Sequence, residues 1–205
     1  DLASFMEQIR TAISSKVIGH NSLWFVLPYD DPNLARQVQA ANLTIMEFGF
    51  ADPSLQSGTG QYSWTAKMAF VDKVHALGRN LIDRDSRTKD LPNPVQWQEY
   101  GLANFFLMND GNDFYSTIFQ VFPPAGDPAD DWWNGYDVDL GSATTPRYLW
   151  NNLWRRDFTN GFVLVNPPGG AATTVDLGAN YIDIYGNSYS TITLAENQAR
   201  ILITD

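Results

Sequence analysis

The sequence predicts an α/β part followed by an all-β part, and three observations support this fold class. Segments with apolar residues at helical spacing alternate with short apolar runs over residues 1–122. Only strand-forming segments and turns follow Gly161. Between these parts, Phe162 to Val165 is an unbroken apolar run bounded by Asn160-Gly161 and Asn166-Pro167. This pattern is typical of a strand that is covered on both faces.

Four segments of the first part have the start signals and the apolar spacing of helices. Asp1 can cap the first helix, and Asp31-Pro32 supplies a cap and a first-turn proline for the second. Ser63 caps the third helix, and Asn93-Pro94 opens the fourth. The apolar residues at helical spacing are Leu2, Phe5, Met6, Ile9 and Ile13 in the first helix, Leu34, Val38 and Ala41 in the second, and Trp64, Met68, Val71, Val74 and Leu77 in the third.

Four short apolar segments near these helices are predicted to be strands. They are Ser22 to Leu27, Leu43 to Phe50, Asn80 to Asp83 and Ile118 to Phe122. Strands that alternate with helices imply a parallel sheet with right-handed crossovers. Four such strands are half of a (β/α)8 barrel, and a small open sheet is the alternative.

The chain from Pro123 to Asn152 is irregular and rich in Pro, Gly, Asp and Trp, and long loops in compact domains tend to be functional. After the apolar run at 162–165 the predicted strands are Thr173 to Leu177, Tyr181 to Tyr185, Ser190 to Leu194 and Arg200 to Thr204. We therefore expect a half-barrel over residues 1–155, with the irregular loop at 123–152. A small all-β C-terminal domain is expected over residues 156–205.

Composition excludes several classes of function. The formal charge of −10, from 13 basic and 23 acidic residues, argues against a nucleic-acid backbone as partner. The chain has no cysteine, so thiolate nucleophiles and cysteine-ligated metals are excluded. No apolar run approaches the ~20 residues of a membrane span. No Gly-rich phosphate loop or Gly-x-Ser-x-Gly elbow occurs, and we expect no cofactor.

Few lysines with many Thr, Asn, Gly and Tyr favour an extracellular or cell-surface location.

Two neighbouring motifs carry a resemblance to known proteins. Residues 136–141 read YDVDLG, and residues 155–167 read RRDFTNGFVLVNP. Together they resemble the C-terminal part of glycoside-hydrolase-like (β/α)8-barrel proteins, a group of poorly characterised glycosidase-like families. In those proteins a short β-domain follows the barrel and closes on an apolar edge strand, which Ala199 to Ile203 matches here.

The resemblance implies the C-terminal half of a barrel with an appended β-domain, and binding or hydrolysis of a polysaccharide outside the cell. It matches Tyr100 to Met108 to the helix before the last barrel strand, and Glu47 to a glutamate at a strand end. Members of such families carry four more strand–helix units ahead of the matched part. Three explanations stay open: the chain is a fragment of a longer polypeptide, another chain supplies the other half, or catalysis has been lost.

Glycoside hydrolysis needs two carboxyl groups that flank one bond, roughly 5 Å apart for retention and roughly 6.5–9.5 Å apart for inversion. Glu47 is the leading catalytic candidate, because it is the only charge in an apolar strand and lies near its carboxyl end. The alternative for Glu47 is a glutamate paired with a barrel arginine. Asp30, after the first strand, and Asp83, at the end of the third, are the other catalytic candidates. Each could instead be a loop or helix-cap carboxylate.

Aromatic side chains are the candidate substrate contacts, because the apolar faces of sugar rings suit them. They are Trp132, Trp133, Phe50 and Tyr62. The alternative for the two tryptophans is that they pack the long loop onto the rim of the barrel.

No metal site is expected from the sequence. Asp110 to Asp113 and Asp127 to Asp131 gather oxygen ligands of the kind that Ca²⁺ prefers. Neither segment fits an EF-hand loop, and we interpret both as solvated acidic turns. His20 and His75 are too far apart in the sequence to indicate a metal-binding pair.

Two functions follow from these observations. In the first, the chain acts on or binds an extracellular polysaccharide by paired-carboxylate chemistry, and carbohydrate is its partner. In the second, it is a non-catalytic structural or assembly protein built from a degenerate glycosidase-like half-barrel. Four barrel strands leave two open edges. We therefore expect a second polypeptide along the outer strands, either a complementary half or a copy of the chain itself.

Overall fold

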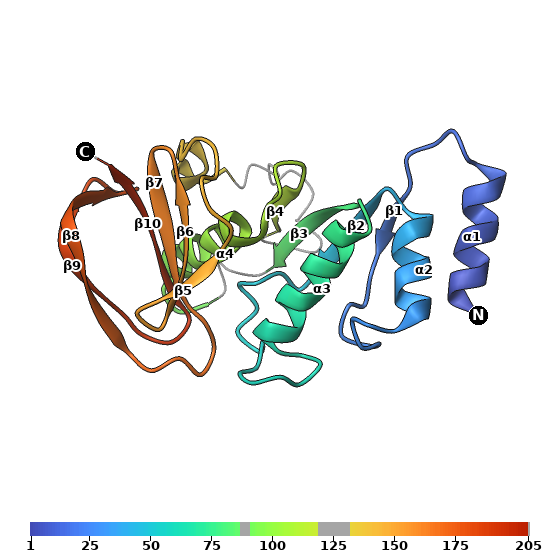
Figure 1. Ribbon diagram of the computed structural model, residues 1–205, viewed down its shortest axis with the longest axis horizontal. Helices are drawn as coiled ribbons and strands as arrows, with labels where there is room; N and C mark the ends of the chain where they lie inside the picture. Colours follow the sequence, from blue (N-terminus) through green and yellow to red (C-terminus); the bar gives the residue numbers. More distant parts are fainter. Residues whose placement is uncertain (87–90, 119–131, 205) are drawn as a thin grey trace, which may run out of the picture. The chain divides into compact units, whose positions relative to one another are not determined.

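The computed structural model describes residues 1–86, 91–118 and 132–204 of the 205-residue chain. It is a mixed α/β structure with a four-stranded parallel sheet and a six-stranded antiparallel sheet (Figure 1). The chain divides into two compact units. The first contains Asp1–Asp85 and Met108–Ser116, and the second contains Ser86–Leu107 and the residues from Thr117 onward.

The parallel sheet of the first unit has the order β1-β2-β3-β4. Its strands are β1 (Gly19–Asn21), β2 (Leu43–Glu47), β3 (Asn80–Ser86) and β4 (Phe114–Ile118). Leu43 lies beside Gly19 on one side and beside Asn80 on the other, in parallel register. The predicted parallel α/β arrangement is therefore confirmed, and the described residues do not close a barrel.

Three helices of this unit begin at the predicted caps. They are α1 (Leu2–Ala12), α2 (Pro32–Ala40) and α3 (Trp64–Ala76). The Asp1 carboxylate accepts a hydrogen bond from Ser4 N at 2.7 Å, and the Ser63 hydroxyl accepts one from Ala66 N at 3.1 Å. These bonds satisfy first-turn N–H groups that have no partner within a helix. The side chain of Asp31 caps α2 in the same way.

Polar contacts join α1 to α2. Arg36 of α2 donates through Nε and Nη2 to the Glu7 carboxylate of α1, at 2.8 and 2.6 Å. Arg10 of α1 donates through Nε to the carbonyl of Ala40 at 2.9 Å. Because a bidentate arginine contact fixes direction as well as distance, these bonds set the orientation of the two helices.

The apolar stripe of α1 is covered only in part. Met6 is buried, whereas Leu2 is 53% exposed, Phe5 58% and Ile13 44%. We expected this stripe to cover the sheet. In the described residues, half of it instead faces outward from the first unit.

The segment predicted as the first strand is not a strand. β1 ends at Asn21, and residues 24–26 form a turn. In a strand, Trp24 and Val26 would share one face. The structure buries Trp24 to 2% exposure and leaves Val26 55% exposed. The indole of Trp24 is stacked on Tyr62 at 5.4 Å between ring centroids, and this packing replaces strand pairing.

Three further strand boundaries of the parallel sheet differ from the prediction. β2 ends at Glu47 because Phe48 adopts a φ of 58°, which leaves the extended region. β3 continues beyond Asp83 to Ser86. β4 begins at Phe114, and residues 119–122 of the predicted strand lie outside the described residues.

The antiparallel sheet of the second unit has the order β5-β6-β7-β10-β8-β9. Its strands are β5 (Tyr148–Trp150), β6 (Leu153–Phe158), β7 (Gly161–Asn166), β8 (Thr173–Asp183), β9 (Ser188–Leu194) and β10 (Gln198–Thr204). All six residues of β7 are buried, so the predicted covered strand at 162–165 is confirmed. Phe162 and Leu164 belong to its hydrophobic core, with Leu153, Val175, Leu177, Ile192, Leu194 and Leu202.

Helix α4 (Pro94–Met108) packs on β10 of this sheet through a buried glutamate. The Glu99 carboxylate accepts from Ile201 N at 3.1 Å and from Arg200 Nη1 at 2.8 Å. Burial raises the pKa of Glu99 to about 7, although the charge of Arg200 opposes this. A second anchor joins α4 to β6, where Arg156 Nη1 donates to the carbonyl of Phe106 at 2.9 Å.

We expect Leu164→Asp to prevent folding of the second unit. Leu164 is fully buried in β7, and the change removes ~1.5–3 kcal/mol of apolar burial and adds a buried carboxylate. That is a large part of a typical stability of roughly 5–15 kcal/mol. Circular dichroism and urea unfolding measure the effect. Leu149→Asp, at a residue of β5 that is 60% exposed, is the control and should fold. A folded Leu164→Asp protein would contradict the assignment of β7 as the core strand.

Candidate functional site

The carboxyl ends of the parallel strands gather the polar and aromatic residues of the first unit. The segment after β1 holds Trp24 and Asp30, and the segment after β2 holds Phe50 and Tyr62. In parallel sheets, ligands bind outside the carboxyl ends of the strands. This edge is therefore the candidate binding site of the first unit.

Side chains at this edge divide between two faces of the sheet. Met46, Asp83 and Asp85 are buried on the face that α3 covers. Glu47 and Arg84 alternate with them and point to the opposite face. Asp83 and Glu47 therefore lie on opposite faces, and their carboxyl groups do not flank one common space.

Glu47 forms an ion pair with Arg84 on the open face. Arg84 Nη1 donates to Glu47 Oε1 at 2.8 Å, and the two side chains are 34% and 39% exposed. The parallel register causes this contact, because it places Glu47 directly beside Arg84. Glu47 is thus paired with an arginine, which was the alternative weighed for it, and it still reaches solvent at a strand end.

The covered face holds a buried cluster of three ionisable side chains: Lys67 of α3, and Asp83 and Asp85 of β3. All three are fully buried. Lys67 Nζ donates to the carbonyl of Phe48 and lies 4.6 Å from the ring centroid of Phe50. Burial lowers the pKa of Lys67, and the charges of Asp83 and Asp85 oppose this effect.

The two carboxylates of this cluster differ in their hydrogen bonds. Asp85 accepts from Ala51 N and from the Tyr115 hydroxyl, each at 2.7 Å. Neither oxygen of Asp83 has a well-formed hydrogen bond among the described residues, although the nearby backbone of Phe50 favours its charged form. Burial, and then the charge of Asp85, raise the pKa of Asp83 well above its ordinary value. Burial also raises the pKa of Asp85, but the hydrogen bond from Tyr115, the charge of Lys67 and the hydrogen bond from Ala51 oppose this effect. The proton therefore belongs on Asp83, which leaves Lys67 and Asp85 as a neutral pair.

Gly49, in the segment that follows β2, lies directly against the Asp85 carboxylate of this cluster. A Cβ added at Gly49 would lie 2.0 Å from Asp85 Oδ1, so no other residue fits there without displacing the carboxylate. Sequence analysis did not identify Lys67, Asp85 or Gly49 as part of a site. The available signals were two aspartates two residues apart in β3 and a lysine flanked by Trp64 and Met68 of an apolar helix face.

The other candidate residues of the first unit, Asp30, Phe50 and Tyr62, differ in burial and in their contacts. Asp30 is exposed in the segment after β1. Phe50 is fully buried against Lys67, and Tyr62 is part-buried and donates to Asp52. Burial and then this hydrogen bond raise the pKa of Tyr62 to about 12.

The two candidate tryptophans belong to the second unit. Trp132 is 63% exposed, and its ring lies edge-on to Tyr136 at 5.5 Å between centroids. Trp133 is partly buried and contacts the same tyrosine at 5.4 Å.

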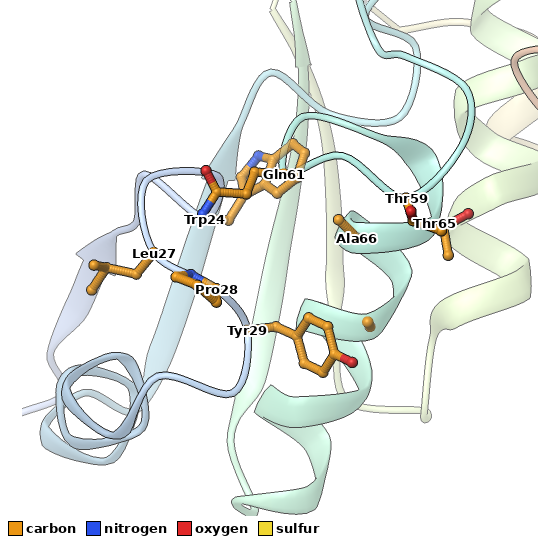
Figure 2. Close-up of a pocket in the computed structure, with 9 residues that line it drawn as sticks. Trp24, Leu27, Pro28, Tyr29, Thr59, Gln61, Thr65 and Ala66 are labelled. Carbon is orange, nitrogen blue, oxygen red and sulfur yellow. The ribbon is translucent and has the colours of Figure 1, made fainter.

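A cavity of about 290 Å³ opens beside Trp24 at the carboxyl edge of the sheet (Figure 2). Figure 2 shows the ring of Tyr29 beside α3, with Thr65 and Ala66 in the first turn of that helix. Its described lining residues are aromatic, aliphatic, small or uncharged polar. The cavity is near the lower size limit for small-molecule sites. Its lining contains none of the predicted catalytic residues.

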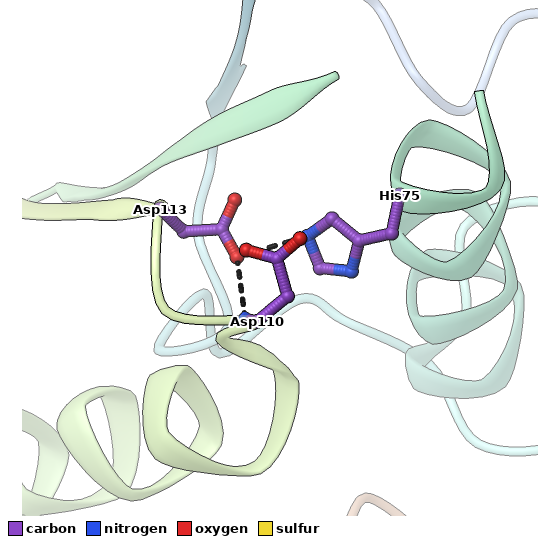
Figure 3. A group of neighbouring side chains, drawn as sticks. All are labelled: His75, Asp110 and Asp113. Carbon is purple, nitrogen blue, oxygen red and sulfur yellow. Dashed lines mark hydrogen bonds and ion pairs between the residues drawn. The ribbon is translucent and has the colours of Figure 1, made fainter. Parts of the chain in front are cut away.

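His75, Asp110 and Asp113 are close enough to hold a metal ion, since their ligand atoms lie within 4.8 Å of one another (Figure 3). They lie at the opposite end of the sheet, where β4 begins. His75 Nε2 is 2.9 Å from Asp113 Oδ2, and Asp113 also accepts from Leu81 N at 2.7 Å. These bonds explain the cluster as a structural connection between α3, β3 and β4. The predicted acidic turn at 127–131 lies outside the described residues.

No family model matches the sequence, and no curated protein matches it. Among the described residues, no helix has both the length and the apolar character that a membrane crossing requires.

We expect the three members of the buried cluster to differ in their effect on stability. Lys67→Met leaves Asp85 buried without its cation and should cost about 3–5 kcal/mol. Asp85→Asn should also be costly, because it removes a charged partner of Lys67. Asp83→Asn should cost less than about 1 kcal/mol, since a protonated Asp83 is already neutral. Urea unfolding measures all three, and an Asp83→Asn cost equal to that of Asp85→Asn would contradict this assignment of the proton.

We expect His75 to make stability depend on pH. Burial lowers the pKa of His75, but the hydrogen bond to Asp113 and the charges of Asp113, Asp110 and Asp72 outweigh it, so the pKa is raised. The stabilising effect is full below the unfolded pKa of ~6.5 and is lost as pH rises through the folded pKa. His75→Gln should therefore lower the free energy of unfolding more near roughly pH 5 than near roughly pH 9.

His20→Gln is the matched control for this experiment. Burial lowers the pKa of His20, and the hydrogen bond with Gln37 only partly offsets it. The neutral imidazole is therefore favoured in the folded state, and the pH dependence of this variant should have the opposite sign. Equal pH dependence in both variants would contradict the role of Asp113.

Proposed function

We propose that the first unit is half of a (β/α)8 barrel and that its open sheet face binds or hydrolyses a polysaccharide, with Glu47 as the acid/base carboxylate. The position of Glu47 carries this proposal. It lies at the carboxyl end of β2, on the face opposite α3, and its side chain is 39% exposed. In (β/α)8 barrels this face is the interior, and carboxyl strand ends form the mouth where catalytic residues lie.

The pattern of burial along the strands supports a barrel interior. Ile45, Glu47, Ile82 and Arg84 share the open face, and all are partly exposed in this unit. Phe114 of β4 is 56% exposed, and it shares that face because the neighbouring Tyr115 reaches Asp85 on the other. Parallel sheets normally have both faces covered, and barrel interiors are filled by bulky apolar side chains.

Arg84 gives Glu47 a fixed orientation at this mouth. A glycosidase needs one carboxyl group that protonates the leaving glycosidic oxygen and a second that activates water or attacks the sugar carbon. Glu47 supplies one such group. Asp83 is buried on the opposite face, so the second group comes from Asp30 or from outside this chain. The motifs at 136–141 and 155–167, which resemble those of glycosidase-like proteins, support polysaccharide as the substrate class and an extracellular location.

The second unit offers a separate surface for sugar rings. Trp132 presents a largely exposed indole beside Tyr136, and aromatic faces stack on the apolar faces of sugars. This surface supports carbohydrate as the partner whether or not Glu47 is catalytic.

A non-catalytic assembly function is the second candidate. The outward apolar stripe of α1 favours it, since an exposed contiguous apolar surface marks an interaction site. Loss of hydrolysis with retained polysaccharide binding would favour this candidate.

We expect Glu47→Gln to lower the rate of polysaccharide hydrolysis by about 10²–10⁴-fold, the usual contribution of a general acid or base. Reducing-sugar release from a panel of polysaccharides measures this rate, and calorimetry measures binding to the same panel. Glu7→Gln is the control, because Glu7 also pairs with an arginine at an exposed site. Unchanged hydrolysis in Glu47→Gln would remove Glu47 from the mechanism.

A further inference from the structure

The parallel sheet has two unfilled edges within the described residues. β1 pairs only with β2, and β4 lies beside β3 alone. Exposed edges attract other strands, and proteins usually protect them with charged residues, proline or bulges. Residues 17–23, which include β1, contain no charged residue and no proline.

The backbone of β1 is ready to pair on its open side. Leu43 N donates to Ile18 O, and Ser22 N donates to Ile45 O. In a parallel pair, alternate residues direct their N–H and C=O groups to opposite sides. Gly19 and Asn21 therefore direct these groups away from β2, and both residues are exposed.

The exposed stripe of α1 adds apolar surface beside the open edge of β1. A hollow of about 210 Å³ lies between its exposed stripe and β1, and a second of about 380 Å³ continues past the end of the strand. Both hollows are lined by Leu2 and His20, so they adjoin along the edge; the smaller one is mainly apolar, and the larger one mixes apolar and polar residues. A strand beside β1 would cover the smaller hollow.

The order of the elements indicates which strand fits there. The chain runs helix–strand four times, from α1–β1 to α4–β4. In a (β/α)8 barrel each helix covers the two strands that it connects. α1 precedes β1, so its outward stripe suits a strand beside β1, and the described residues place no strand there. β4 is a parallel strand whose outer edge matches this need.

We propose that a second copy of the chain closes the sheet, with β4 of each copy pairing in parallel with β1 of the other beneath the stripe of α1. This inference rests on the proposed half-barrel. The twofold axis then runs along the barrel, which keeps all eight strands parallel. Both copies of Glu47 come to the same mouth and face each other. The second copy thereby supplies the second carboxylate that glycoside hydrolysis requires.

The mass in solution gives the first test. Light scattering of the 205-residue chain should give twice the 23.0 kDa of one chain. Phe5→Lys places a charge on the stripe at a residue that is 58% exposed, so it should leave the fold intact and weaken the dimer by at least about tenfold. Val95→Lys, at a 46% exposed residue of α4, is the control and should dimerise normally. A monomer of the unmodified chain at every concentration would overturn the proposal.

Cross-linking tests which edges meet. The chain has no cysteine, so single-cysteine variants report one position each. Gly19→Cys is tolerated, since an added Cβ would meet only Ile45 Cδ1 at 3.7 Å, and Phe114→Cys replaces an exposed ring. A short bis-maleimide should join a mixture of these two variants at least about tenfold faster than either variant alone. Faster linkage of Gly19→Cys to itself would show that two β1 edges meet, and would overturn the parallel closure.

The two proposals fail in different ways. A monomer that still hydrolyses polysaccharide through Glu47 would overturn closure and keep the proposed function. A cross-linked dimer of the expected pattern without hydrolysis or binding would keep closure and overturn the proposed function.

In a closed dimer, adding an excess of Glu47→Gln chains should inhibit the unmodified protein, because mixed dimers contain only one of the two carboxylates.

Discussion

The buried electrostatic interaction of Lys67 with Asp83 and Asp85 is the constraint on which the first unit depends. It joins α3 to β3, and the Phe48 carbonyl and the Ala51 amide bring in the segment that follows β2. The Tyr115 hydroxyl adds β4. Burial of one lysine and two aspartates is stabilising only while their charges balance. Packing and electrostatics are therefore coupled at this edge, and loss of the charge on Lys67 or Asp85 should affect every strand from β2 to β4.

This cluster also explains why the open face carries the functional candidate. The same alternation that buries Asp83 and Asp85 turns Glu47 and Arg84 to the other side. The covered face is fixed by full burial and hydrogen bonds, so it can hold the strand ends in place. The open face keeps a polar pair that reaches solvent. A rigid support behind an accessible carboxylate is the arrangement that precise positioning of a reacting group requires.

The sequence predicts the element types well where the pattern is long or strong. Helix caps at Asp1, Asp31 and Ser63 and the apolar run of β7 appear as expected. It fails at Ser22 to Leu27, because an apolar run cannot show that Trp24 leaves the strand to stack on Tyr62. The outward half of the α1 stripe was also unexpected, since helical spacing identifies an apolar face but not what covers it.

The candidate site residues could also be predicted from the sequence, but their surroundings could not. Glu47 could be selected from the sequence because it is a single charge in an apolar strand, but the face it occupies depends on register with β3. Asp83 could be selected as a strand-end carboxylate, yet its burial depends on Lys67, which lies 16 positions earlier in the sequence, on α3. Long-range charge pairing leaves no local pattern, so sequence analysis missed Lys67 and Asp85.

The buried Glu99 between α4 and β10 gives the second unit a preferred chemical environment. Its pKa of about 7 lies above the ordinary value, so the folded unit binds a proton that the unfolded chain releases between these two values. The contribution of Glu99 to the free energy of unfolding is therefore largest below the ordinary glutamate pKa and declines as the pH rises toward about 7. Glu99 thus couples the attachment of α4 to the acidity of the medium.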